Sequence, residues 1–105
     1  MIGHMKNPPH PGGIITETLE ETGLSLRELA KRLDVAPSTL SRLAKGEIAL
    51  TGEMAVKIAA VIGGSAHVWL AMMADYAAAQ AEKTVNVSHL KRLELPVESN
   101  IDALH

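Results

Sequence analysis

The sequence has 105 residues, of which 47% are hydrophobic, and it carries a formal net charge of −2. This length supports one domain with a modest core, and the absence of cysteine excludes disulfides and thiolate metal sites and suits a reducing cytoplasm. No apolar run approaches the roughly 20 residues of a membrane span, so we expect no membrane partner. Because aromatic residues make up 2% of the chain, aliphatic residues, alanine and methionine must fill the core, which favours close-packed short helices.

The two ends of the chain differ from the rest in composition. Residues 1–4 resemble a cloning scar ahead of a natural start at Met5, and no secretory leader opens the chain. Residues 7–13 are rich in proline and glycine and predict an extended arm, so we expect residues 1–8 to be a disordered arm or scar. Residues 95–105 have little to pack against and predict a loose tail.

Two helices are predicted in the first third of the chain. Apolar residues at helical spacing predict a first helix over residues 12–22, and Gly23 supplies its left-handed stop. Ser25 and Glu28 form a capping box, with a serine cap and a glutamate three residues later. They predict a second helix whose apolar residues extend to Leu33 and define one buried face.

A third helix is predicted over residues 37–44, because Pro37 suits the first position of a helix, where its missing N–H costs nothing. Two short helices joined by a turn of three to four residues form a helix-turn-helix, here over residues 25–44. The apolar positions of both helices and the turn agree with this interpretation: Leu29, Ala30, Val35, Leu40 and Leu43.

Two further helices follow. Thr51 is a predicted cap for a fourth helix that the Gly63-Gly64 pair stops. Ser65 caps a fifth helix, in which Trp69 begins an apolar stripe, and an alanine-rich stretch continues this helix to about Glu82. Residues 84–88 alternate in polarity and predict a short edge strand, and residues 88–93 predict one or two helical turns.

Small and apolar residues near the end of the fifth helix exceed what a five-helix core needs. We interpret them as a dimer contact, formed by Ala74, Ala77, Ala78, Ala81, Val85, Val87 and Leu90. The expected architecture is therefore an all-α, five-helix domain over residues 9–82, followed by a dimerisation segment and tail over residues 83–105.

Charge is distributed unevenly along the chain. Residues 25–45 hold five basic and two acidic residues, a net charge of +3, although the whole chain is acidic. The outward face of the third helix presents small hydroxyls and, one turn later, Arg42. Hydroxyls can contact bases or phosphates, and an arginine can pair with the O6 and N7 atoms of guanine in a major groove. Pattern alone leaves open a helical hairpin whose Arg42 is merely solvated.

A resemblance to a known family adds to this interpretation. Residues 25–46, SLRELAKRLDVAPSTLSRLAKG, resemble the phage-repressor-like helix-turn-helix of the XRE superfamily. Three flanking features narrow the resemblance: the triplet His10-Pro11-Gly12, residues 50–60 and residues 62–70. Together, over about residues 9–87, they are similar to the HigA (VapI-like) antitoxins of bacterial toxin–antitoxin modules.

The resemblance implies a five-helix phage-repressor-like fold and a homodimer that binds a palindromic operator in its own promoter. It also implies a partner toxin similar to HigB, a RelE-like mRNA endonuclease that acts on the ribosome. Because no set of catalytic groups is visible in the sequence, we expect no enzymatic activity, and we expect no cofactor or metal. It implies a bacterial cytoplasmic protein that joins the nucleoid when bound. Base reading is expected from Pro37, Ser38, Ser41 and Arg42. Contacts with the DNA backbone are expected from Ser25, Arg27, Thr39 and Lys45.

Three positions depart from the family pattern. Leu26 and Pro37 stand where repressors often carry glutamine, and Ala36 stands where serine or threonine is frequent. The third helix should therefore lack a side-chain cap worth about 1 kcal/mol. These departures remove polar contacts and leave more of the readout to Ser38 and Arg42.

Other polar residues have ordinary explanations. The five histidines match no metal-ligand spacing, so a structural or surface role is expected for each. Glu17, Glu20 and Glu21 cluster on the first helix without a nucleophile or a histidine partner, which favours a solvated face or a contact with a basic toxin. Two alternatives to an antitoxin stay open: a regulator of the same superfamily without a toxin, and a helical interaction module that binds no DNA.

Overall fold

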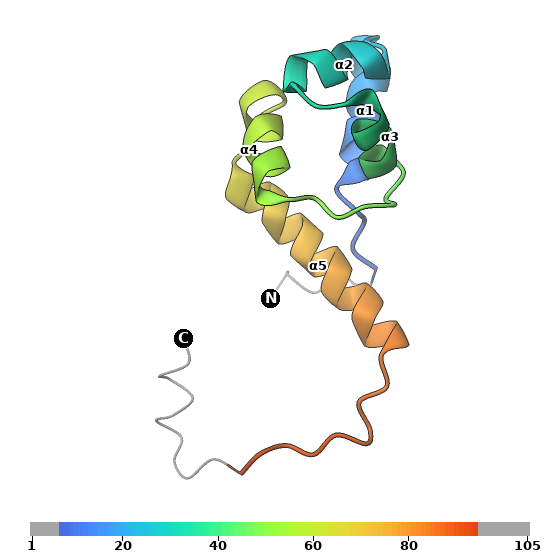
Figure 1. Ribbon diagram of the computed structural model, residues 1–105, viewed down its shortest axis with the longest axis vertical. Helices are drawn as coiled ribbons and strands as arrows, with labels where there is room; N and C mark the ends of the chain where they lie inside the picture. The colour runs from blue at the N-terminus through green and yellow to red at the C-terminus, as the bar shows by residue number, and fades with distance from the viewer. Residues whose placement is uncertain (1–6, 95–105) are drawn as a thin grey trace.

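A computed structural model describes residues 7–94 of the chain, so the predictions for residues 1–4 and for the tail lie outside the described residues. Within this part the architecture is all-α, with five helices and no strand (Figure 1). The helices are α1 (Gly12–Thr22), α2 (Leu26–Leu33), α3 (Pro37–Ala44), α4 (Gly52–Val61) and α5 (Ala66–Thr84). The predicted all-α fold and the bounds of the first four helices are confirmed.

Local signals explain where these helices begin and end. Gly23 follows α1 with a φ of 74°, the left-handed conformation that glycine adopts without strain. Ser25, Thr51 and Ser65 each accept a hydrogen bond from a backbone N–H in the first turn of α2, α4 and α5. Ala36, which precedes α3, makes no such bond, as its methyl side chain requires.

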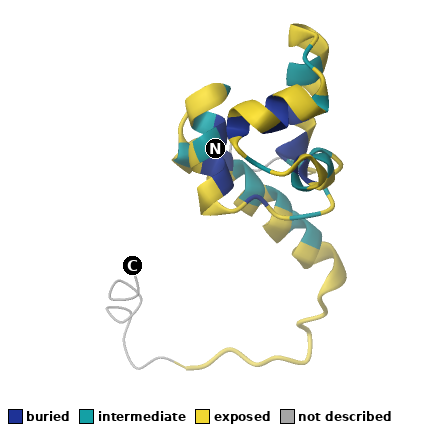
Figure 2. Ribbon diagram, turned by 45° about the horizontal axis from the view of Figure 1, so that its top comes forward, coloured by how far each residue is buried: buried dark blue, intermediate teal, exposed yellow. Residues whose placement is uncertain are grey.

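The core lies where α1 to α4 meet the first turns of α5. Leu29, Ala30 and Leu33 face it from α2, and Leu40 and Leu43 face it from α3. Ala30 is 1% exposed, so this apolar position of the helix-turn-helix lies in the core as predicted. Helix α3 packs on α1 and α2, and α4 packs on α2 and α5. Helices α2 and α3 therefore each bury one face in the core and expose the other (Figure 2).

Helix α5 extends away from the four shorter helices (Figure 1). Trp69, 4% exposed, is its buried residue, and its indole N–H donates to the carbonyl of Gly63 at 2.8 Å. Farther along, Met72, Met73 and Tyr76 are half-buried, and every described residue from Ala81 onward is exposed. The expected apolar stripe is confirmed, but Trp69 is its only fully buried residue, and the other three are half-buried.

Two predictions for the segment after α5 are wrong: the strand at residues 84–88 and the helical turns at residues 88–93. Helix α5 ends at Thr84, two residues beyond the approximate predicted end. Residues 85–87 form no strand, although Val85 is extended. A strand needs a partner to receive its backbone hydrogen bonds, and the described chain offers none. In place of helical turns, residues 88–93 hold a single turn, closed by a bond from the Leu90 N–H to the Val87 carbonyl at 2.9 Å.

Among residues 7–94, no helix combines the length and the hydropathy that crossing a membrane requires.

Candidate DNA interface

The first part of the candidate interface is the start of α2. The Ser25 side chain accepts the Glu28 N–H at 3.1 Å, and the Ser25 N–H donates to the Glu28 carboxylate at 2.8 Å. The predicted capping box is therefore confirmed. The hydrogen bond from the Ser25 backbone favours the charged carboxylate and, helped by the Ser25 side chain and by Arg32, lowers the pKa of Glu28 below its ordinary value.

The turn between α2 and α3 is held from both of its sides. Asp34 adopts the left-handed conformation with a φ of 55°, which aspartate tolerates better than most residues. The Val35 N–H donates to the Ala30 carbonyl at 3.0 Å, which closes the end of α2. From α4, the Lys57 ammonium donates to the Asp34 carbonyl at 2.8 Å and pairs with Glu53 at 3.3 Å. These bonds set the position of α3 relative to α2.

Helix α3 divides into a buried and an exposed face. Leu40 and Leu43 are at most 1% exposed, and Pro37 occupies the first helical position as predicted. The opposite face carries the residues predicted to read bases. Pro37, Ser38 and Arg42 are exposed and Ser41 is half-buried. Ser38 and Arg42 are four residues apart, so they lie one turn apart on one face and can approach the same groove.

The residues predicted to contact the DNA backbone flank this face. Ser25 and Arg27 are exposed at the start of α2, Thr39 is half-buried in the first turn of α3, and Lys45 is exposed just after that helix. Within residues 7–94, Arg27 and Lys45 form no ion pair with an acidic side chain, and neither does Arg42. Their charges therefore remain available to phosphate groups.

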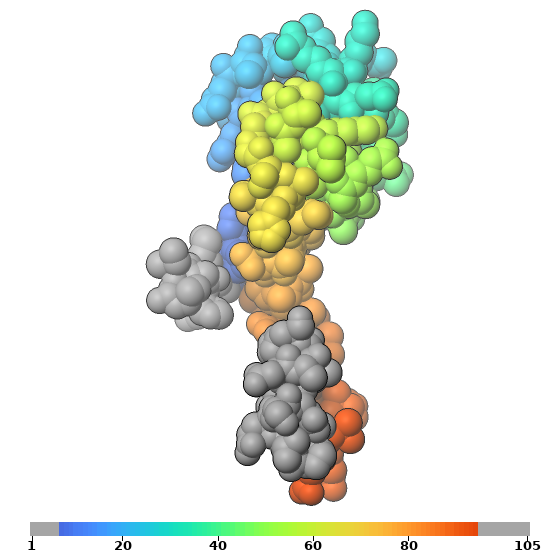
Figure 3. Space-filling view, turned by 90° about the vertical axis from the view of Figure 1, so that its left-hand side faces the viewer, coloured from blue at the N-terminus to red at the C-terminus, as the bar shows by residue number. Residues whose placement is uncertain are grey.

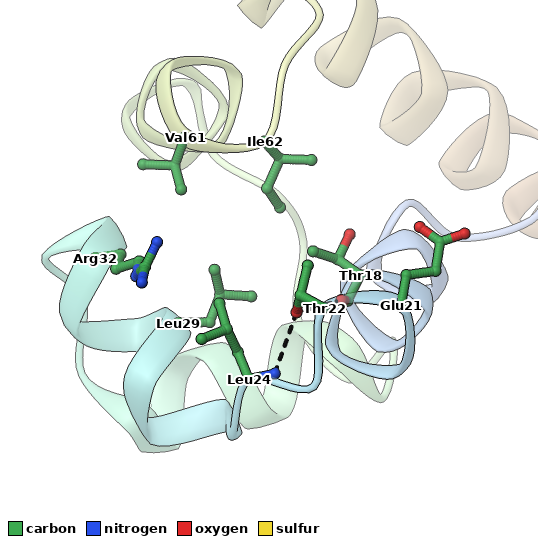
Figure 4. Close-up of a pocket in the computed structure, with 8 residues that line it drawn as sticks. All are labelled: Thr18, Glu21, Thr22, Leu24, Leu29, Arg32, Val61 and Ile62. Atoms are coloured by element: carbon green, nitrogen blue, oxygen red, sulfur yellow. Dashed lines mark hydrogen bonds between the residues drawn. The ribbon is translucent and has the colours of Figure 1, made fainter.

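A surface pocket of about 280 Å³ lies on another side of α2, between the end of α1 and the end of α4 (Figure 4). The side chains of Leu29 and Arg32 point from α2 toward Val61 on α4. On the side of the pocket formed by the end of α1, the Thr22 hydroxyl accepts a hydrogen bond from the Leu24 N–H at 3.2 Å. Four aliphatic side chains line the pocket together with two threonines and the charged side chains of Glu21 and Arg32.

The residues predicted to form the dimer contact are all exposed on this single chain. Ala74, Ala77, Ala78 and Ala81 are exposed on α5. Beyond the helix, the side chains of Val85, Val87 and Leu90 are 58%, 58% and 62% exposed. The space-filling view shows this region projecting beyond the helical bundle (Figure 3).

Two residues that support the interface were not assigned to it from the sequence. The sequence does not predict the role of Lys57, because nothing in a helical lysine indicates a hydrogen bond to a carbonyl 23 residues away. The sequence predicts a structural or surface role for His10, and its hydrogen bonds with Gly12 and Ile48 confirm the structural one. The triplet at residues 10–12 was the available signal, although it does not reveal the partner in the distant loop.

Comparison with known proteins agrees with this geometry. Residues 15–69, which include all of α2, α3 and α4, match the helix-turn-helix family. The chain belongs to the helix-turn-helix family. Among relatives of this family, the HTH-type transcriptional regulator YddM of Escherichia coli is 53% identical over 89 residues, covering 85% of this chain and 95% of YddM.

Solved helix-turn-helix structures share the same architecture. The antitoxin GraA is 26% identical with a TM-score of 0.77, covering 86% of this chain and all of GraA. The antitoxin HigA of Pseudomonas aeruginosa, solved with the higBA promoter, is 26% identical with a TM-score of 0.72, covering 85% of this chain and all of that HigA. Since these likenesses cover most of both chains, they include α5 as well as the helix-turn-helix.

Proposed function

We propose that this chain is a DNA-binding repressor and antitoxin that binds its own operator as a dimer and neutralises a HigB-like, RelE-like mRNA endonuclease. The cytoplasm is its expected location, at the nucleoid when it is bound to DNA. In this proposal residues 9–82 form the DNA-binding domain and residues 83–105 contribute to dimerisation.

The exposed face of α3 is the single observation that carries the DNA-binding part. Buried leucines fix one side of the helix, so Ser38 and Arg42 are presented together on the other. In the proposed complex α3 enters the major groove, where Arg42 pairs with guanine and the hydroxyls of Ser38 and Ser41 contact base edges. Pro37 contributes apolar contact at the start of the helix.

Backbone contacts would orient α3 in the groove without reading sequence. Arg27 and Lys45 supply positive charge at the two sides of the helix-turn-helix, and the hydroxyls of Ser25 and Thr39 donate to phosphate oxygens. The likeness to HigA of Pseudomonas aeruginosa, which was solved with its promoter, supports this placement. A local net charge of +3 lets an acidic chain approach DNA by one face.

The dimer would form through the alanines of α5 and the segment that follows. Alanine lets two helices approach closely, and Val85 and Val87 leave an apolar hollow of about 310 Å³ uncovered beside Ala81. Two copies that cover this surface for each other would place two α3 helices for a palindromic operator.

The toxin-binding surface is proposed to include the acidic face of α1. Glu17, Glu20 and Glu21 are exposed there, and Glu21 lines the pocket shown in Figure 4. A basic toxin would find these carboxylates next to a recess lined by both polar and apolar side chains. Charge reversal at all three glutamates should abolish capture of the toxin while operator binding persists; unchanged capture would contradict this surface.

Electrophoretic mobility shift on the promoter fragment of the chain's own gene tests the DNA-binding part. The expected result is a complex that weakens steeply with salt and that a shuffled fragment of equal length does not form. A chain that shifts neither fragment at low salt would be the interaction module without DNA binding.

A stand-alone transcriptional regulator is the second candidate. The relative YddM, which is described as an HTH-type transcriptional regulator, favours it. The gene beside this one separates the two candidates. An adjacent gene for a basic ribonuclease-like protein, whose product co-purifies with this chain and is silenced by it, supports the antitoxin. Operator binding without such a partner supports the stand-alone regulator.

A further inference from the structure

His10 uses both nitrogens of its imidazole ring to join two distant parts of the chain. The Gly12 N–H, at the start of α1, donates to Nδ1 at 2.8 Å. The other nitrogen, Nε2, lies 3.0 Å from the carbonyl oxygen of Ile48 in the connection between α3 and α4. Because Nδ1 accepts a hydrogen bond, the ring proton resides on Nε2 and is donated to Ile48. Both ring nitrogens are therefore engaged, one with the start of α1 and one with the connection between α3 and α4.

The end of α3 packs directly on this histidine and its neighbours. A Cβ atom placed on Gly12 would lie 1.9 Å from the Leu43 carbonyl oxygen, so the start of α1 touches the backbone of the last turn of α3. A Cβ on Gly46 would lie 3.6 Å from the His10 ring. The imidazole therefore lies against the residues that follow α3 and beside the glycine that packs on its last turn.

Helix α5 meets the same ring from another direction. The rings of His10 and Tyr76 make an edge-to-face contact, with centroids 4.9 Å apart and an angle of 73° between their planes. Nearby, the Leu50 N–H donates to the sulfur of Met73 at 3.2 Å, which ties the same connection to α5 a second time. His10 consequently contacts α5 directly through Tyr76, and it is linked to α3 through Gly12, which packs against the Leu43 carbonyl, and through Gly46, just after that helix.

We propose that His10 is a positioning residue that fixes the angle between α3 and α5 and so sets the distance between the two α3 helices in the dimer. This proposal rests on the proposed function for its effect on DNA. Its structural part concerns one chain and stands without DNA. A looser angle would leave each α3 able to enter a groove but would relax the required spacing of the two half-sites.

Pulsed electron resonance between two spin labels tests the structural part. The sequence has no cysteine, so a double variant with Ser38→Cys on α3 and Ala71→Cys on α5 takes up spin labels at these two positions only. Dilution with unlabelled chain keeps the measured distance within one molecule. We expect one narrow distance distribution with His10 present and a broadened or shifted one in His10→Ala. An unchanged distribution in His10→Ala would overturn the proposal.

Two partial replacements and one control keep the test independent of folding. In His10→Asn the amide oxygen can take the place of Nδ1, and in His10→Gln the amide nitrogen can take the place of Nε2. Both variants should fold by circular dichroism and give distributions between those of the original chain and His10→Ala. His67→Ala changes an exposed histidine of α5 and should leave the distribution unaltered. Equal broadening in His67→Ala would overturn the assignment to His10.

Operator titrations test the consequence for DNA. The promoter fragment and a version with one extra base pair between its half-sites are compared for each variant. The preference for the natural spacing should fall at least about threefold in His10→Ala, the order expected for lost hydrogen bonds, and less in His10→Gln. An unaltered preference would overturn the proposal. If the unmodified chain binds neither fragment, the proposed function fails, and the distance distributions alone decide the role of His10.

Discussion

The helix-turn-helix and the far end of α5 differ in how much of their apolar surface the described part of the chain buries. In α2 and α3 four of the five leucines are buried, the start of α2 is capped, and the turn accepts a hydrogen bond from Lys57 of α4. Beyond Tyr76 the side chains are largely exposed, and Val85, Val87 and Leu93 are 58%, 58% and 80% exposed. Within residues 7–94 the first region buries most of its apolar side chains, whereas the second leaves apolar side chains exposed, which is the surface that the proposed dimer would cover.

The largest effect separates these two regions by stability. Leu40→Ala should lower the free energy of unfolding by about 2–5 kcal/mol, because Leu40 is fully buried and its removal leaves a cavity. Leu93→Ala, at an exposed position, should change it by less than about 0.5 kcal/mol. Urea denaturation of both variants at low protein concentration gives the comparison. Similar losses would show that the far end is part of the monomer core.

A pair of adjacent glycines tests the packing of α1 on α3. Gly12→Ala should destabilise the chain by about 2–3 kcal/mol, because the new methyl group would collide with the Leu43 carbonyl. Gly13→Ala has nothing within 4 Å of its new Cβ and should be neutral or slightly stabilising. Thermal denaturation followed by circular dichroism measures both, and equal effects would contradict the close contact.

At the proposed interface, two basic residues should behave differently. Arg42→Ala should weaken operator binding by about 1–3 kcal/mol and relax the base preference at one position. Lys45→Ala should weaken binding to every sequence alike and reduce the salt dependence. Titrations of operator variants at several salt concentrations distinguish the two. A loss of preference in Lys45→Ala with none in Arg42→Ala would reverse the assignments.

The exposed segment after α5 is tested by oligomeric state. Val87→Asp should weaken dimerisation at least tenfold, about 1.4 kcal/mol, because it places a charge in an apolar contact. Val56→Asp makes the same change at a position 60% exposed on α4 and should leave dimerisation intact. Sedimentation equilibrium measures both dissociation constants; the dimer contact lies elsewhere if Val56→Asp has the greater effect.

The smallest expected effect concerns the cap of α2. Because the capping box lowers the pKa of Glu28, its contribution to stability is present above the ordinary glutamate value of about 4.3 and is lost as the pH falls through the lowered value. Ser25→Ala keeps the backbone N–H that donates to Glu28 but removes the serine side chain, so it should raise the pKa of Glu28 part of the way toward that ordinary value. Carboxyl NMR titration measures the change, with Glu20, an exposed residue of α1, as an internal control.

Local chemistry explains which parts could be predicted from the sequence. The capping box at Ser25, the proline at position 37 and the glycine at position 23 act on their own neighbours, so their effects are visible in the sequence and are found in the structure. The exposed face of α3 followed from the burial of Leu40 and Leu43, because helical spacing places other residues opposite them.

Contacts between distant residues could not be predicted in this way. His10 bonds to Ile48, 38 residues away, and Lys57 bonds to Asp34, 23 residues away, and neither pairing has a local pattern. The strand expected after α5 failed for a related reason. Alternating polarity at residues 84–88 favours an extended chain, but a strand also requires a partner that one described chain does not contain.

Chemical-shift mapping with the promoter fragment tests the central claim most directly. Labelled protein is titrated with the DNA under conditions where its oligomeric state is constant, and the backbone signals are compared along the chain. The account predicts the largest changes at Ser38, Ser41, Arg42 and Lys45, with small changes on α4. Changes concentrated on α4 or α5, with α3 unaltered, would contradict the assignment of α3 as the DNA-reading helix.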